Sequence, residues 1–130
     1  MLGRNGWPFR IVVMDASREE RDVIKDVLQA STDMAVVGEA SDRAGGTALI
    51  ETLAPDAVVI GPSCSWSDAT KATKAFLSQA HVVVVGVRAP GSTRVKGVWA
   101  EVDGEHIDRL PGAIRRSCEL QSQFDPGRSQ

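Results

Sequence analysis

The sequence predicts an α/β fold in which helices cover both faces of a five-stranded parallel sheet, a three-layer, doubly wound arrangement. Short, continuous apolar runs recur along the chain, as expected for strands that are buried on both faces. Segments with apolar residues at helical spacing separate most of these runs. The 130 residues, 42% of them hydrophobic, are enough to form a buried core without disulfides or a structural metal.

The expected elements follow one another in a regular order. The predicted strands are residues 11–14, 34–37, 57–60, 82–87 and 98–102. The predicted helices are residues 18–30, 42–53 and 67–80, followed by a last helix that Asp108 caps. Residues 10–121 then form the domain, residues 1–9 an N-terminal lead-in, and residues 122–130 a tail or linker.

Capping residues and apolar stripes support three of the helices. Ser17 and Glu20 predict a capping box, in which the Ser17 hydroxyl accepts from the Glu20 amide and the Glu20 side chain reaches back. Either Ser41 or Asp42 caps the second helix, and Pro111 is tolerated because it falls in the first turn of the last. The predicted inner faces are Val23, Ile24, Val27 and Leu28 in the first helix, Ala44, Ala48, Leu49 and Leu53 in the second, and Leu110, Ala113, Ile114 and Cys118 in the last.

The connection between the fourth and fifth strands is unusually short. Only ten residues, 88–97, separate the two strands, whereas a parallel crossover usually needs a dozen or more and contains a helix. Either this crossover is abbreviated and lacks the fourth helix, or residues 89–92 form a turn and the fifth segment pairs antiparallel. The short parallel crossover is the favoured interpretation.

Charge and composition exclude several classes of function. The net charge is −2, which argues against direct nucleic-acid binding or capture by an anionic membrane. No apolar run approaches the ~20 residues of a membrane span, and the N-terminus lacks an apolar signal region. Two cysteines are too few for a disulfide framework, and the two histidines lack spaced partners for zinc. We therefore expect a cytoplasmic protein without a cofactor.

Four segments carry a resemblance to a known family. They are RIVVMDASREERDVIKDVL, MAVVGEASDRAGGTALIETLAPDAVVI, HVVVVGV and AIRRSC. Over residues 10–118 the chain resembles the receiver domain of bacterial two-component response regulators, which has a flavodoxin-like fold. In that family, two acidic residues after the first strand and an aspartate after the third hold Mg²⁺, and this aspartate accepts the phosphoryl group. A Thr or Ser after the fourth strand and a Lys after the fifth contact the phosphate.

The chain departs from this pattern at most of the pocket positions. Asp15 matches the first acidic residue, but Ala16 stands at the second and Gly61 at the phospho-acceptor. Gly86 matches the hydroxyl position, and Glu101 lies near the lysine position. The resemblance therefore implies an atypical pseudo-receiver that cannot form an aspartyl phosphate and is not an enzyme. Asp15 itself either bonds the amides of the following loop or belongs to a residual cation site.

Two functions remain for such a domain. The first is regulatory protein–protein interaction with a partner or a second copy. Such a module could stand before a helix-turn-helix transcription factor or a pilus-assembly localisation ATPase. Arg109, Arg115 and Arg116 form a solvated face or part of a dimer surface. The second function is sensing of a small anion or nucleotide by loop 61–67, where hydroxyls of Ser63, Ser65 and Ser67 precede a helix. No nucleophile–base pair supports catalysis.

Overall fold

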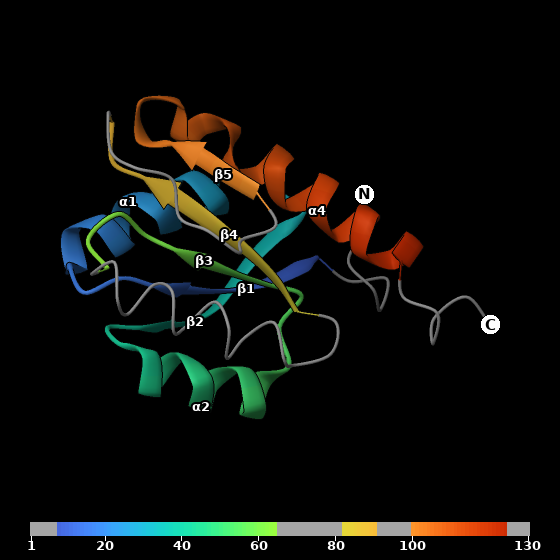
Figure 1. Cartoon of the computed structure of the whole chain (residues 1–130), viewed down its shortest axis with the longest axis horizontal. Coiled ribbons are helices and arrows are strands. Elements are labelled where there is room, and N and C mark those ends of the chain that lie inside the picture. The colour runs from blue at the N-terminus through green and yellow to red at the C-terminus, as the bar shows by residue number, and fades with distance from the viewer. Residues whose placement is uncertain (1–7, 65–81, 91–99, 125–130) are drawn as a thin grey trace.

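The computed structural model describes residues 8–64, 82–90 and 100–124 (Figure 1). The strands are β1 (Phe9–Met14), β2 (Met34–Ala40), β3 (Ala57–Ile60), β4 (Val83–Arg88) and β5 (Ala100–Asp103). The helices are α1 (Arg18–Gln29), α2 (Arg43–Leu53), the 3₁₀ helix η1 (Gly104–Arg109) and α4 (Leu110–Phe124). The predicted third helix, residues 67–80, and the first two residues of the predicted fifth strand lie outside the described residues.

The five strands form one parallel sheet in the order β2-β1-β3-β4-β5. Helices α1 and α4 cover one face and α2 lies on the other, which confirms the predicted three-layer architecture (Figure 1). β5 pairs parallel to β4, with Val85 opposite Ala100. The parallel pairing of the fifth strand is therefore confirmed and the antiparallel alternative is wrong, whereas the predicted lack of a fourth helix falls in residues 91–99, outside the described residues.

The core has two apolar layers because successive strand residues point to opposite faces of the sheet. On the side of α1 and α4, Ile24, Leu28, Leu110 and Ile114 are fully buried against strand residues that include Val13. On the other side, the buried residues of β1, β3 and β4 pack with Ile50 of α2. The predicted stripe of α4 is confirmed.

The predicted inner faces of the first two helices need correction. In α2 the predicted Leu49 and Leu53 do pack against the core, but the buried residues are Gly46 and Ile50, and Ala44 and Ala48 are exposed. The helix is rotated because Ile50 removes more apolar surface from water than an alanine can, and Gly46 places no side chain between helix and sheet. In α1, Val23 is 47% exposed and does not join the core.

The helix ends agree with the predicted caps only in part. Ser17 Oγ accepts from the Glu20 amide at 3.3 Å, but the described residues contain no return bond from the Glu20 side chain. The Ser17 amide donates instead to Asp15. Asp42 is the cap of α2 and accepts from Gly45 N at 2.8 Å. Asp108 lies within η1 and makes no side-chain bond to the first turn of α4 among the described residues.

The ends of the domain also differ slightly from the predicted boundaries. β1 already begins at Phe9, and α4 continues to Phe124, three residues into the segment predicted as a tail. Arg115 fixes α4 to the segment before β2 through two hydrogen bonds to Asp33, of 2.6 and 2.7 Å. In the described part of the chain, no helix is long and apolar enough to cross a membrane.

Candidate functional site

The sequence positions singled out for the pocket meet at the carboxyl edge of the sheet. In the strand register, Met14, Ile60, Gly86 and Glu101 form one row across β1, β3, β4 and β5. Asp15 and Gly61 directly follow Met14 and Ile60, the last residues of the neighbouring strands β1 and β3, whereas β4 and β5 continue for two residues beyond this row. In open α/β sheets this edge is where ligands bind. The fold therefore brings the candidate residues together, although they are far apart in the sequence.

Asp15 is fully buried at this edge, and its carboxylate binds two backbone amides. Oδ1 accepts from Ser17 N at 2.7 Å, at the start of α1. Oδ2 accepts from Ser63 N at 2.8 Å, in the loop after β3 and 48 residues further along the chain. The first bond is the contact with the following loop, one of the two alternatives predicted for Asp15. The second joins two loops, and no sequence pattern predicted it.

Gly61 lies directly against the Asp15 side chain. A Cβ on Gly61 would be 2.8 Å from Asp15 Cγ and 2.9 Å from Asp15 Cβ, and closer still to Oδ2. Such distances are shorter than real carbon contacts, so either residue would have to move. The Asp15 carboxylate thus fills the space into which a side chain at position 61 would extend.

The loop after β3 is held to the end of β1 by further contacts. Gly61 N donates to Met14 O at 2.8 Å, and Cys64 Sγ lies 3.8 Å from the same oxygen. Cys64 N donates back to Gly61 O at 3.4 Å. The loop binds the negatively charged Asp15 carboxylate through the backbone amide of Ser63.

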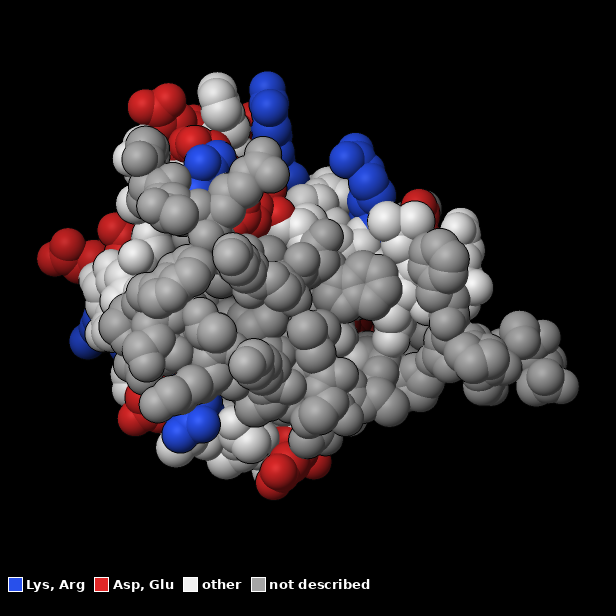
Figure 2. Space-filling view, in the orientation of Figure 1, with Lys and Arg blue, Asp and Glu red and all other residues white. Residues whose placement is uncertain are grey.

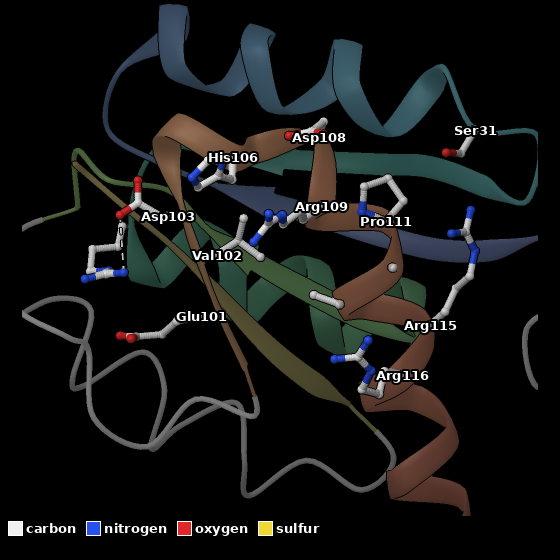
Figure 3. A pocket seen from close by; sticks show the side chains of 13 residues that line it. Ser31, Glu101, Val102, Asp103, His106, Asp108, Arg109, Pro111, Arg115 and Arg116 are labelled. Carbon is white, nitrogen blue, oxygen red and sulfur yellow. Dashed lines mark ion pairs between the residues drawn. The ribbon is translucent and has the colours of Figure 1, made fainter. Parts of the chain in front are cut away.

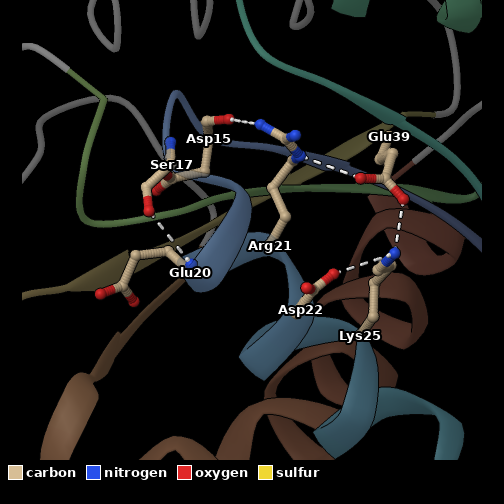
Figure 4. A network of polar contacts seen from close by, with 7 residues as sticks. All are labelled: Asp15, Ser17, Glu20, Arg21, Asp22, Lys25 and Glu39. Atoms are coloured by element: carbon tan, nitrogen blue, oxygen red, sulfur yellow. Dashed lines mark hydrogen bonds and ion pairs between the residues drawn. The ribbon is translucent and has the colours of Figure 1, made fainter.

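An ion-pair network supports the other side of the Asp15 segment (Figure 4). Arg21 donates to the backbone oxygen of Asp15 at 2.7 Å and pairs with Glu39 of β2 at 2.9 Å. Lys25 also pairs with Glu39, and with Asp22 on its own helix. The hydrogen bonds from Lys25 and Arg21 lower the pKa of Glu39, and the bond to Glu39 raises the pKa of Lys25. The network fixes α1 to β2 beside the loop that follows β1.

The remaining predicted site residues do not provide the hydroxyl and the cation that contact the phosphate in the receiver pattern. Gly86 has no side chain, and the half-buried Glu101 of β5 brings a carboxylate rather than a cation. Ser63 contributes its backbone N–H rather than its hydroxyl, and its side chain is exposed. Ser65 and Ser67 lie outside the described residues. No group of three His, Cys, Asp or Glu side chains in the described ranges could hold a metal ion.

A groove of about 740 Å³ runs along η1 and the first turns of α4, beside the edge strand β5 (Figure 3). Arg88 pairs there with Asp103 at 3.3 Å, and Arg115 is occupied by Asp33. Arg109 and Arg116 are exposed and form no ion pair within the described part of the chain.

The predicted basic cluster on the last helix comprises Arg109, Arg115 and Arg116. The structure separates the paired Arg115 from the two exposed arginines. Elsewhere on the surface, described acidic and basic side chains are intermixed around the face seen in Figure 2.

Comparison with known proteins places this geometry in context. No protein-family model matches the chain. Over 95% of its length, the chain is 26% identical to the protein-glutamate methylesterase/protein-glutamine glutaminase 5 of Geobacter metallireducens. Over the same share of its length, the chain is 27% identical to the protein-glutamate methylesterase/protein-glutamine glutaminase 1 of Geobacter sulfurreducens. The chain spans about a third of the length of these curated relatives, 35% and 34%.

Solved structures of receiver domains have the same fold as this chain. The response regulator domain of Thermotoga maritima CheB superposes with a TM-score of 0.70 at 20% identity, over 92% of this chain and 99% of that one. The CheY-like receiver domain of Methanospirillum hungatei gives 0.71 at 16% identity, over 91% and 99%. The flavodoxin-like receiver fold predicted from the sequence is therefore confirmed.

Proposed function

We propose that this chain, which has the fold of response-regulator receiver domains, is a signalling module that acts through protein–protein contacts and carries no aspartyl phosphate. The observation that carries the proposal is the position of the Asp15 carboxylate. It occupies the space of an acceptor side chain at position 61 and is already bonded to two amides. Phosphoryl transfer to a carboxylate needs an acceptor oxygen and a metal ion that neutralises the developing charge. Gly61 offers no oxygen, and Ala16 offers no second carboxylate to a cation.

The neighbouring strands support the same proposal. The row of β4 and β5 beside the site contains Gly86 and Glu101, and one residue further on stand Val87 and Val102. Neither row supplies a hydroxyl on β4 or an ammonium group on β5. A phosphoryl group at this edge would therefore meet neither of the two side chains that the receiver family uses to contact it.

We propose the groove along η1 and α4 as the contact surface, and a segment with acidic side chains as its occupant. Arg109 and Arg116 lie at the two ends of segment 109–116, which lines the groove and includes Gly112. Both arginines are exposed and unpaired among the described residues. Two unpaired guanidinium groups favour carboxylates, because charge-assisted, bidentate pairs form readily with them. We assign the acidic segment to another protein, and a molecular mass that rises with the concentration of this chain alone would point instead to a second copy.

The curated relatives are enzymes, but we propose no catalysis for this chain. It matches about a third of each relative, and the methylesterase and glutaminase activities are named for the whole proteins. We propose the regulatory role of a receiver instead, in the cytoplasm.

The test is to incubate the chain with Mg²⁺ and acetyl phosphate, or with Mg²⁺ and beryllofluoride, and to measure intact mass and thermal melting. A conventional receiver domain treated in parallel is the positive control. We expect no phospho-adduct and no change in Tm for this chain. A stoichiometric adduct, or a Mg²⁺-dependent rise in Tm, would show a working phospho-acceptor and overturn the proposal.

A further inference from the structure

We infer that the backbone amides of Ser17 and Ser63 form an anion-binding site whose built-in ligand is the Asp15 carboxylate. This carboxylate holds residues 61–64 against the end of β1 in the absence of phosphate or metal. The inference rests on the proposed function and deepens it, because it names what fixes the loop in a domain that is not phosphorylated.

The geometry of the two hydrogen bonds carries the inference. The two N–H groups come from different loops and converge on one carboxylate, each on its own oxygen, at 2.7 and 2.8 Å. Both distances are typical of charge-assisted bonds. Asp15 is fully buried and has no cation at ion-pair distance among the described residues, so these amides are what stabilises its charge.

The surroundings of the carboxylate fit a dedicated ligand position. Gly61 leaves the room that the carboxylate fills, and any Cβ there would collide with it. Arg21 fixes the backbone of Asp15 from the other side through a 2.7 Å bond to its carbonyl oxygen (Figure 4). The side chain is therefore confined between a fixed backbone and the two donors. An anion from solution could reach the Ser63 amide only by displacing it.

Truncation of Asp15 should turn the internal site into an open one. In Asp15→Gly the two amides remain, while the space of the carboxylate becomes free for a small anion. Formate has the same charged group and should bind there, because a ligand that binds only the native state raises the apparent stability. Asp15→Asn is the matched control, since its side chain fills the same space and leaves no room for formate.

Cys64 provides a local readout next to Ser63. Neither Cys64 nor Cys118 forms a disulfide, so both can be alkylated, and their rates can be compared by mass spectrometry of the same sample. Loss of the Asp15 contact should release the loop and raise the alkylation rate of Cys64 roughly tenfold, while Cys118 in α4 stays within about twofold.

The experiment measures Tm and both alkylation rates for the wild type, Asp15→Gly and Asp15→Asn. Each protein is tested in sodium formate and in sodium chloride of equal ionic strength. We expect formate to raise the Tm of Asp15→Gly by more than about 3 °C and to slow Cys64 alkylation, with no effect on the other two proteins. Equal effects of formate and chloride on Asp15→Gly would overturn the inference.

Two further outcomes keep the test decisive. If Asp15→Gly does not fold, the Cys64 rate in Asp15→Asn decides, because the amide side chain can accept only one of the two bonds. An unchanged rate in that variant would contradict the inference. Acetyl phosphate treatment of the wild type in the same series tests the proposed function separately. An unmodified wild type, together with no formate effect on Asp15→Gly, would overturn only the anion site, whereas a phospho-adduct on the wild type would overturn the proposed function.

Discussion

The Asp15 carboxylate and the α-carbon of Gly61 face each other so closely that the identity of one residue restricts the other. A Cβ at position 61 would lie 2.8 Å from Asp15 Cγ, inside the shortest distance that real side chains show. The loop that begins at Gly61 depends in turn on the carboxylate, through the amide of Ser63. An aspartate at the first position and a glycine at the second therefore belong to one arrangement of the pocket.

This dependence predicts strong coupling between substitutions at the two positions. Gly61→Ala should destabilise the chain by about 1–3 kcal/mol, because the new methyl group displaces the buried carboxylate from its donors. In an Asp15→Gly background the same substitution has room and should cost much less, which gives a coupling energy of about 1 kcal/mol or more. Urea unfolding of the four proteins measures it. Additive effects within about 0.5 kcal/mol would show that the two residues do not compete for the same space.

Gly112 offers the opposite case and a control for the first prediction. A Cβ on this residue would meet no atom within 4 Å, although Gly112 lies inside α4. Gly112→Ala should therefore stabilise the chain by about 0.5–1 kcal/mol, because alanine restricts the unfolded chain and favours the helix. Urea unfolding checks the sign. Destabilisation would mean that the open space beside Gly112 in the groove is closed in solution.

The fold was predictable because its main signals are local and repeated. Apolar runs of strand length predict every strand in the described residues to within a few positions, and the favoured parallel pairing of the fifth strand agrees with its register on β4. The inner face of α2 was predicted only in part, because Leu49 and Leu53 pack against the core whereas Ala44 and Ala48 are exposed. Its small residues carry a weak periodic signal, and burial of Ile50 against the sheet decided the rotation.

The site was predictable only as a set of missing groups. Sequence positions alone indicated that Gly61 and Ala16 lack the side chains of the receiver pattern. The contact between Asp15 and Ser63 had no signal, because the donor is a backbone amide and every residue except proline has one. The combination of an acidic residue after one strand and a glycine after its neighbour is the feature that could have indicated it. Parallel register places such residues side by side.

The pairing of Asp33 with Arg115 makes a prediction about stability and pH. The two hydrogen bonds from Arg115 lower the pKa of Asp33 from its ordinary value of 3.8. The Asp33 side chain is 14% exposed and that of Arg115 33%, so solvent weakens the pair without abolishing it. Asp33→Asn should therefore destabilise the chain at pH 7 by about 1–2 kcal/mol.

The sign of the pH effect follows from the lowered pKa in the folded state. The ionised Asp33 binds a proton less readily in the folded than in the unfolded chain, so its contribution is complete above pH 3.8 and is lost as the pH falls through the lower, folded value. The wild type should lose its advantage over Asp33→Asn in this acidic range. Urea unfolding from pH 7 to pH 3 measures the difference.

Arg116→Gln, at an exposed position next to Arg115, is the control and should change stability by less than about 0.5 kcal/mol. A constant difference between wild type and Asp33→Asn across this range would contradict the assignment, since a pair that loses its charge must lose its contribution.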